Sequence, residues 1–254
     1  MNPMLELDHV SKSFGGLKAV DSVGFRIEPG EIFGLLGPNG AGKTVCFNLI
    51  SGVFRPNEGR IFFDGMRTDG FPSHRMAKLG LGRTFQIVKP FSNVSVLENV
   101  VAALGIQRYD HLTAIWSNRN ERSIQSRAME LLEQVGLAGV AYRKAGLLPL
   151  GNLRRLEIAR ALAVGTKLIL LDESFSGLRH EEILQLEALV RQIRDAGRTI
   201  LLIEHNMKVA MGLCNRIVVL DHGRVLAQGT PEEIRSNPAV IEAYLGKQGG
   251  SHAA

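Results

Sequence analysis

The chain is poor in cysteine and has no long apolar run. Its 254 residues include two cysteines, Cys46 and Cys214, which lie far apart and belong to no CxxC pair. Disulfide frameworks and zinc sites need closely spaced cysteines or histidines, so this pattern predicts two reduced, buried thiols in a cytosolic protein. No stretch approaches the roughly 20 apolar residues that cross a bilayer, and the acid-containing start MNPMLELDHV does not look like a secretory signal. We therefore expect any membrane association to come through a partner.

The composition is that of a globular protein. Apolar residues make up 45% of the chain and charged residues 22%, which is enough to bury a core in one large domain or in a domain with a subdomain. The formal net charge of +5 suits the phosphates of a nucleotide, nucleic acid or an anionic membrane surface. The charge by itself does not choose among these partners.

Short apolar runs alternate with segments of helical period, which predicts an α/β protein. We expect strands at residues 5–10, 23–27, 31–36, 58–65, 167–173 and 199–205, and a hairpin at 216–229 that turns at His222 and Gly223. We expect helices at residues 43–51, 128–137, 181–195, 231–236 and 238–245. Residues 95–147 carry few strand signals and are interpreted as a helical insertion between two halves of a sheet.

A glycine-rich loop, GPNGAGKT, follows the strand at residues 31–36 and precedes a helix. It fits the pattern G-x-x-x-x-G-K-[ST], in which backbone N–H groups and a helix N-terminus surround phosphate. Lys43 would reach the β- and γ-phosphates and the Thr44 hydroxyl would ligate Mg²⁺. The alternative is a glycine-rich turn that matches by chance. The expected phosphate-binding residues are Gly37, Pro38, Asn39, Gly40, Ala41, Gly42, Lys43 and Thr44.

Two further elements carry candidate catalytic groups. The apolar run LILL delivers Asp172 and Glu173 to the carboxyl end of a strand, where one carboxylate can hold Mg²⁺ and its neighbour can polarise water. Acid pairs after strands are common, but a position ~130 residues after a phosphate loop favours function. His205 closes the next apolar run, where the alternative to a catalytic role is a structural hydrogen bond.

With these elements in this order, the chain resembles the ATP-binding subunits of ABC transporters over nearly its whole length. Phe14, in SKSFGG, matches the aromatic residue that stacks on adenine in that family, and ordinary core packing is the alternative for it. Gln86, in RTFQ, matches the glutamine that ligates Mg²⁺, and a surface polar residue is the alternative there. The sequence LPLGNLRRLEIARAL at residues 148–162 takes the place of the signature motif, which opens a helix. The sequence SGL at residues 176–178 matches the D-loop.

The resemblance implies a fold and a domain organisation. The implied fold is an α/β P-loop NTPase: an ABC ATPase core with a mixed sheet, an N-terminal antiparallel β part and an inserted α-helical subdomain. Residues 1–254 would form a single nucleotide-binding domain, in which residues 1–86 and 165–245 make a RecA-like core with a β-subdomain. Residues 87–164 would be the helical signature subdomain, and residues 246–254 a flexible tail.

The resemblance also implies a mechanism and partners. ATP and Mg²⁺ would be sandwiched between two ATPase subunits, with Glu173 and His205 catalytic and with Thr44, Gln86 and Asp172 ligating the metal. Leu150, Gly151 and Asn152 of the signature would contact the nucleotide held by the other subunit. The expected partners are a second ATPase subunit, two transmembrane permease subunits and, indirectly, a periplasmic solute-binding protein, with no nucleic acid. The location would be the cytoplasmic face of the cell membrane.

The segments RTFQ, PFSNVSVLENV, LIEHNM and AQGTPEEIRSNPAVIEAYLG look like the branched-chain amino acid uptake subfamily. Relatives of that subfamily handle urea, amides or aromatic acids, and subunits for lipopolysaccharide export are close to it. Because the ATPase subunit does not touch the solute, the solute stays open at this point, as does the choice between a homodimer and a heterodimer.

Five positions depart from the family pattern. Val45 replaces a hydroxyl residue of the nucleotide loop, Pro149, Leu150 and Asn152 alter the signature, and Ser174 stands where proline is typical. Two hypotheses follow: an active ATPase that drives solute uptake, or a weakly hydrolysing nucleotide-binding partner in a heterodimer. A third reading, an ABC protein that acts on nucleic acid, is disfavoured because the chain has one cassette and a short insertion.

Overall fold

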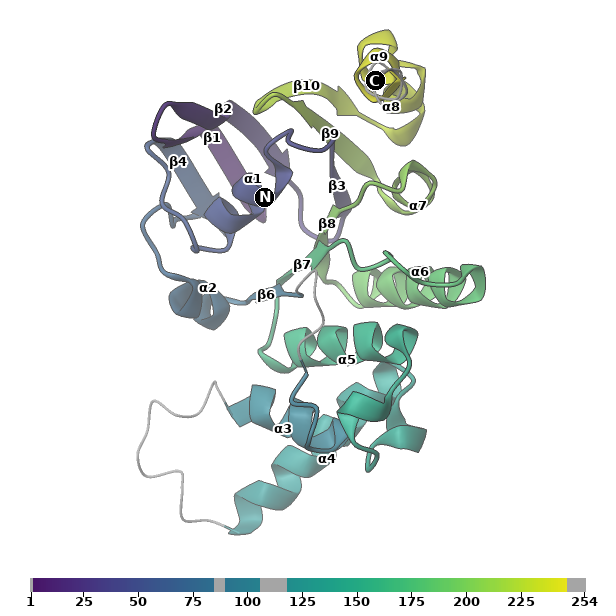
Figure 1. The fold of residues 1–254 in the computed structure, drawn as a ribbon. Helices are drawn as coiled ribbons and strands as arrows, with labels where there is room; N and C mark the ends of the chain where they lie inside the picture. Colours follow the sequence, from purple (N-terminus) through teal and green to yellow (C-terminus); the bar gives the residue numbers. More distant parts are fainter. Residues whose placement is uncertain (1, 85–89, 106–117, 246–254) are drawn as a thin grey trace. The chain divides into compact units, whose positions relative to one another are not determined.

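The computed structural model describes residues 2–84, 90–105 and 118–245. Two compact units make up the chain: Met1–Met76 together with Ile193–Ala254, and Ala77–Gln192 (Figure 1). Gln86 and the expected tail at residues 246–254 lie outside the described residues. The first unit holds the phosphate loop and the second holds the signature segment.

An antiparallel sheet of four strands opens the first unit. The strands are β1 (Leu5–Phe14), β2 (Leu17–Ile27), β4 (Glu58–Phe63) and β5 (Met66–Arg67), in the order β2-β1-β4-β5. Leu5, Leu7 and Val10 of β1 are buried in the core. The strands predicted at residues 5–10 and 23–27 are confirmed, both are longer than expected, and they pair antiparallel.

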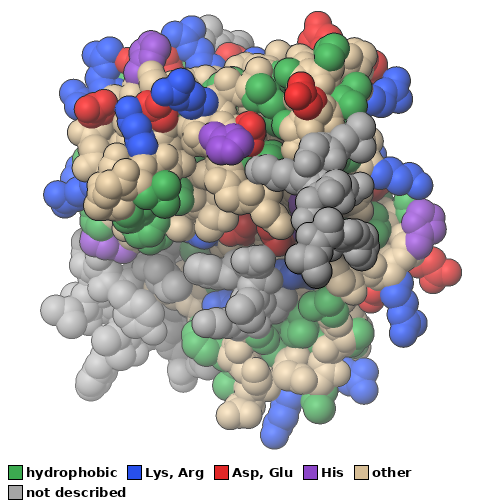
Figure 2. Space-filling view, turned by 45° about the horizontal axis from the view of Figure 1, so that its top comes forward, with side chains coloured by type: hydrophobic (Ala, Val, Ile, Leu, Met, Phe, Trp, Pro, Cys, Tyr) green, Lys and Arg blue, Asp and Glu red, His purple; other side chains and the backbone are tan. Residues whose placement is uncertain are grey.

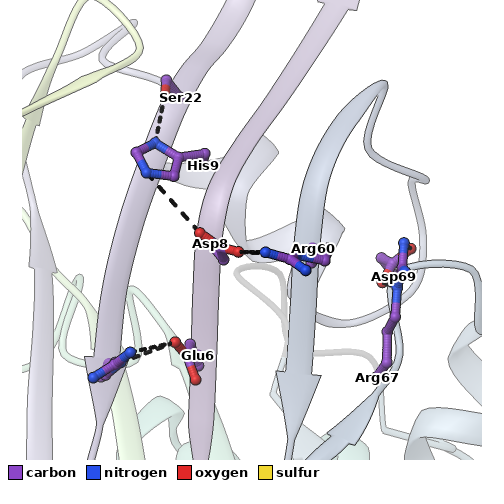
Figure 3. A network of polar contacts seen from close by, with 8 residues as sticks. Glu6, Asp8, His9, Ser22, Arg60, Arg67 and Asp69 are labelled. Carbon is purple, nitrogen blue, oxygen red and sulfur yellow. Dashed lines mark hydrogen bonds and ion pairs between the residues drawn. The ribbon is translucent and has the colours of Figure 1, made fainter.

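The register of this hairpin is broken by β-bulges at His9 and Ser22. Both residues have positive φ, 49° and 52°, and the His9 ring nitrogen Nδ1 lies 2.9 Å from the Ser22 hydroxyl. Next to them, Asp8 pairs with Arg60 directly across the β1–β4 ladder (Nη2 to Oδ2, 2.6 Å) (Figure 3). These contacts are largely exposed, so we assign them to local bulge geometry and register, with little net stabilisation from the ion pair.

The second sheet of this unit is mixed. Strand β3 (Ile32–Leu36) is parallel to both β8 (Thr199–Ile203) and β9 (Arg216–Asp221), and β10 (Arg224–Gly229) is antiparallel to β9. Every residue of β3 and β8 is buried, as the unbroken apolar runs predict for strands covered on both faces. The predicted hairpin at His222 and Gly223 is confirmed, and both turn residues have positive φ.

Four helices belong to this mixed part of the unit: α1 (Lys43–Ile50), α7 (Met207–Leu213), α8 (Pro231–Ser236) and α9 (Pro238–Leu245). The last two have the predicted bounds. The strand predicted to run to His205 is wrong at its end, because β8 stops at Ile203. Asn206 caps α7 by accepting hydrogen bonds from the Lys208 and Val209 N–H groups, and this cap turns the chain into a helix.

The second unit is mainly helical. A short parallel pair, β6 (Leu81–Arg83) and β7 (Leu168–Asp172), accompanies α3 (Val96–Gly105), α4 (Asn118–Gln134) and α5 (Leu150–Ala163), which contact one another. Two 3₁₀ turns lie at Ala138–Val140 and Ala145–Leu147. Helices α2 (Ser73–Leu79) and α6 (His180–Asp195) cross the boundaries between the units. The helical character predicted for residues 95–147 is therefore confirmed in its described parts.

Both cysteines are free and buried, as predicted. Burial raises the pKa of each thiol, Cys46 and Cys214, to about 12. No helix within the described ranges is long and apolar enough to span a membrane.

Candidate functional site

The phosphate loop connects the buried strand β3 to helix α1, as the sequence predicts. Three of its glycines have positive φ: Gly37 (147°), Gly40 (80°) and Gly42 (97°). L-residues with a Cβ rarely adopt these values, so the backbone path of the loop depends on glycine. Asn39, Gly40 and Thr44 are exposed at the surface, while Pro38 and Ala41 are buried beneath it.

Two glycines are also required by close packing. A Cβ on Gly37 would lie 2.2 Å from the backbone oxygen of Leu220, and a Cβ on Gly42 would lie 2.5 Å from that of Ala19. The Gly223 N–H donates to the Ala41 carbonyl at 3.1 Å. Strand β2 and the β9–β10 turn therefore hold the loop in place from outside its own sequence.

Lys43 is the first residue of α1, and its ammonium group lies within the loop. Nζ donates to the carbonyl oxygens of Gly37 (2.7 Å) and Pro38 (3.0 Å), and the residue is 7% exposed. Residues 43–46 include no acidic side chain. The helix N-terminus and the ammonium group thus present positive charge at the loop, and the first turn of α1 contains no acidic residue that would oppose an anion. Val45, which follows Thr44 on α1, is half-buried and brings no hydroxyl.

A residue that sequence reasoning missed also contacts the loop. The Tyr244 hydroxyl, from helix α9, accepts a hydrogen bond of 2.8 Å from the Gly37 N–H. Burial raises the pKa of Tyr244, and the hydrogen bond from Gly37 opposes that rise. The two residues are separated by 207 positions, so no local pattern could have paired them.

Phe14 ends strand β1 with its side chain at the surface. The residue is 43% exposed, the Phe54 ring meets it edge-on at 5.2 Å between centroids, and Lys12 Nζ lies 5.4 Å from its ring centroid. Ordinary core packing, the alternative considered for Phe14, does not describe this position. An accessible ring face is what stacking on a nucleobase requires.

His205 lies in the short connection between β8 and α7 and is exposed. Glu204, just before it, is fully buried. His205 belongs to the same unit as the phosphate loop. The loop follows β3 and His205 follows β8, and these two strands are parallel neighbours.

The second unit carries the acid pair. Asp172 is the last residue of β7 and is 5% exposed. Burial raises the pKa of its carboxyl, and the nearby Arg83 guanidinium opposes that rise. Arg83 Nη2 donates to Asp172 Oδ2 at 3.3 Å, and the Thr84 hydroxyl accepts from the Asp172 N–H at 3.2 Å. Both partners come from the segment that leads toward Gln86.

Glu173 is half-buried and has a φ of 48°. A non-glycine residue in the left-handed region stores backbone strain, and such residues concentrate at functional sites. The neighbouring Ser174 is buried, and its hydroxyl lies 3.2 Å from that of Thr84. Proline is typical at this position, and the contact with Thr84 gives Ser174 a structural role there.

The signature segment forms the start of helix α5. Pro149 is the N-cap, Leu150 is partly exposed, Gly151 is buried and Asn152 is half-buried. A Cβ on Gly151 would lie 2.7 Å from the Glu182 carboxylate oxygen. Glycine therefore allows an element of the same unit to approach the helix start closely.

The predicted residues thus fall into two groups. Phe14, residues 37–44, Val45 and His205 belong to the first unit, whereas Asp172, Glu173 and the signature residues belong to the second. Within the described ranges, no cluster of three or more His, Cys, Asp or Glu side chains could hold a metal by itself. The Thr44 hydroxyl and the Asp172 carboxylate are each the kind of hard oxygen ligand that Mg²⁺ takes, usually together with phosphate oxygens.

Basic and acidic side chains are interspersed on the face shown in Figure 2. The basic side chains on the coloured part of that face therefore form no single basic patch, although the chain has a net charge of +5.

Comparison with known proteins agrees with these features. A family model described as "ABC transporter" matches residues 20–176, and one described as "Branched-chain amino acid ATP-binding cassette transporter" matches residues 224–249. The chain is 40% identical, over 96% of its length and 98% of the relative's, to the high-affinity branched-chain amino acid transport ATP-binding protein BraF of Pseudomonas aeruginosa.

Two solved structures have a similar fold. One is the ADP conformation of an ATP-binding cassette of an ABC transporter, with a TM-score of 0.86, 28% identity and coverage of 97% of this chain and 100% of that one. The other is a dimeric post-hydrolysis state of an ATP-binding cassette bound to ADP and phosphate. Its TM-score is 0.77, with 27% identity and coverage of 90% and 99%.

Proposed function

This chain belongs to the ABC transporter family, and from that premise we propose that it hydrolyses ATP to power the uptake of branched-chain amino acids. The single observation that carries the ATPase part is the phosphate loop, with three glycines of positive φ and the buried Lys43 ammonium at a helix N-terminus. The solute is supported by the family model that matches residues 224–249 and by the name of the 40% identical relative.

The nucleotide would bind along the loop. Phe14 would stack on adenine, and the backbone N–H groups of residues 37–44, with Lys43, would surround the phosphates. Thr44, Gln86 and Asp172 would supply oxygen ligands to Mg²⁺. When bound, Mg²⁺ neutralises charge on the phosphate oxygens.

Hydrolysis needs a base and a polar group at the γ-phosphate. Glu173 would accept a proton from the attacking water while the water oxygen bonds to the γ-phosphorus. The bond between the γ-phosphorus and the bridging oxygen then breaks, and ADP leaves. His205, at the end of the β8 connection, would contact the γ-phosphate. The strained backbone of Glu173 supports this assignment, because strain is retained where a side chain must be held in one orientation.

ABC ATPase subunits act as dimers with transmembrane permease partners. We propose that Leu150, Gly151 and Asn152 of one subunit cover the ATP held by the other, because the N-terminus of α5 offers backbone N–H groups to an anion. Residues 87–164 would form the helical subdomain that docks on a permease, with residues 1–86 and 165–245 as the core. A periplasmic binding protein would deliver the solute, and the subunit would sit on the inner face of the membrane.

A second candidate function, a nucleotide-binding partner with weak hydrolysis, is favoured by two observations. Val45 lacks the hydroxyl that would help to hold the α-phosphate, and Pro149 caps α5 where a serine would donate to the γ-phosphate. One lost charge-assisted bond of ~1.5–3 kcal/mol would weaken ATP binding about ten-fold or more. The chain would then be a weakly hydrolysing partner in a heterodimer.

Two measurements test the proposal. Mg-ATP binding and turnover by the full chain should be lost or reduced by more than about ten-fold in Lys43→Ala, while Lys144→Ala, at an exposed position of the second unit, should retain more of both. A full chain that binds no Mg-ATP would contradict the nucleotide site.

In vesicles with both permeases and the binding protein, leucine, isoleucine or valine should stimulate ATP turnover more than urea or aromatic acids do. Turnover only in a mixture with a second ATPase subunit would favour the second candidate.

A further inference from the structure

We propose that Tyr244 is a positioning residue through which the C-terminal helix α9 sets the conformation of the phosphate loop. This inference rests on the proposed nucleotide site and adds a residue that no motif of the loop contains. It makes the last described helix a determinant of nucleotide affinity.

The contact joins the first residue of the loop to the end of α9. The Gly37 N–H donates to the Tyr244 hydroxyl at 2.8 Å, while the Gly37 carbonyl accepts from Lys43 Nζ at 2.7 Å. Both polar backbone groups of Gly37 are thus bonded, one to the nucleotide-binding lysine and the other to α9. The glycine is buried, so its N–H depends on a protein partner.

Helix α9 is itself held firmly. Asn237 accepts hydrogen bonds from the Ala239 and Val240 N–H groups (3.0 and 3.3 Å), which fixes the start of the helix. Val240 is 2% exposed, and α9 contacts both α8 and β10. Tyr244 is therefore presented by an anchored element, which is what a positioning role requires.

The C-terminal part of the chain also contacts the phosphate loop at a second point. The turn between β9 and β10 donates the Gly223 N–H to the Ala41 carbonyl, four residues after Gly37. The segment from β9 to α9 thus contacts the loop near both of its ends. These two contacts together restrict a stretch whose glycines would otherwise allow many backbone conformations.

Removal of the Tyr244 hydroxyl should weaken nucleotide binding. Without it, the buried Gly37 N–H loses its partner and the loop populates other conformations, so a smaller fraction of molecules can bind nucleotide. Coupling between two sites is reciprocal for binding. Nucleotide on the loop should therefore stabilise α9.

Hydrogen exchange on the full wild-type chain tests that reciprocity without any substitution. Mg-ADP is the probe, because it occupies the loop without turnover. Backbone amides of residues 238–245 should exchange at least about three-fold more slowly with Mg-ADP than without it. Protection of residues 37–44 with unchanged exchange in α9 would overturn the inference and leave the proposed function standing. If the wild type fails to bind Mg-ADP, both the nucleotide site and this inference are wrong.

Substitution gives the second readout. Tyr244→Phe removes the hydroxyl and keeps the ring, and we expect its Kd for Mg-ADP to rise about five-fold or more. Tyr142→Phe is the matched control, because Tyr142 is 80% exposed, and its Kd should equal that of the wild type. Equal affinity in Tyr244→Phe and wild type would overturn the inference. If Tyr244→Phe does not fold, the exchange experiment on the wild type decides.

Discussion

Arg83 donates a hydrogen bond to Asp172 across 89 residues of sequence, from Nη2 to Oδ2 at 3.3 Å. The arginine ends strand β6 and the aspartate ends strand β7, and the two strands are parallel neighbours. Burial disfavours the charged carboxylate, and the guanidinium offsets part of that cost. Arg83 therefore limits the rise in the pKa of Asp172, the metal-ligand candidate of the same unit.

Replacing Arg83 with methionine should destabilise the fold at neutral pH. The pKa of Asp172 is already raised above its ordinary value of 3.8, and loss of Arg83 would raise it further. We expect the free energy of unfolding at pH 7 to fall by about 1–3 kcal/mol, measured by urea unfolding.

The pH dependence has a definite sign. A carboxyl with a raised folded-state pKa opposes folding more as the pH rises through that pKa, and it ceases to oppose folding below about pH 3.8, where it is protonated in both states. The stability difference between wild type and Arg83→Met should therefore shrink from pH 7 toward pH 4.5. A difference that stays constant with pH would contradict this origin. Arg60→Met, which removes an exposed ion pair with Asp8, should cost less than about 1 kcal/mol.

Glu173→Gln should separate binding from chemistry. The substitution keeps the shape of the side chain and removes its ability to accept a proton, so ATP turnover should fall by about 10²–10⁴-fold. The Kd for Mg-ATP should stay within about three-fold of the wild type, since binding rests on the loop. Glu181→Gln, in the exposed first turn of α6, is the control for loss of a nearby charge. Unchanged turnover in Glu173→Gln would remove Glu173 as the base.

Gly151→Ala should fold and still fail to hydrolyse ATP efficiently. The three atoms nearest the added Cβ all belong to the flexible Glu182 side chain, with its carboxylate oxygen closest at 2.7 Å, and this side chain can move away. The signature is expected to act on ATP held by the other subunit, so nucleotide affinity of the isolated chain should persist while turnover falls by at least about ten-fold. Wild-type turnover would show that this helix start does not contact the reacting nucleotide.

Gly37→Ala should behave in the opposite way. Its Cβ would lie 2.2 Å from a backbone oxygen of β9, in a conformation with φ of 147°, so no side chain can move to relieve the contact. We expect a lowered thermal midpoint together with loss of Mg-ATP binding, measured by calorimetry on the same sample. Unchanged affinity would show that the loop tolerates a different path.

The two cysteines should be inert in the native state. Burial raises both pKa values to about 12, so at pH 8 almost no thiolate forms, and both residues are buried. A thiol reagent at pH 8 should modify neither Cys46 nor Cys214 until denaturant unfolds the chain. Rapid reaction of the folded protein would contradict the burial of Cys46 behind the phosphate loop.

Features that depend on neighbouring residues can be predicted from the amino-acid sequence alone. GPNGAGKT specifies its backbone path because glycine allows positive φ, and unbroken apolar runs specify buried parallel strands. Pro231 and Pro238 mark the starts of α8 and α9, since proline fits the first helical position. The apolar run predicts a strand that reaches His205, but β8 ends at Ile203 because the Asn206 cap starts helix α7.

Contacts between residues that are distant in sequence depend on the three-dimensional packing of the chain. Tyr244 reaches Gly37 over 207 positions and Arg83 reaches Asp172 over 89, and neither pair leaves a mark in local composition or period. The Arg83–Asp172 bond forms because β6 and β7 are parallel neighbours, and the Tyr244–Gly37 bond forms in a unit where α9 packs on α8 and β10. Both arrangements are properties of the packed elements and not of the local sequence. Local chemistry therefore identified the phosphate loop, and long-range packing selected the residues that hold it and the acid pair in position.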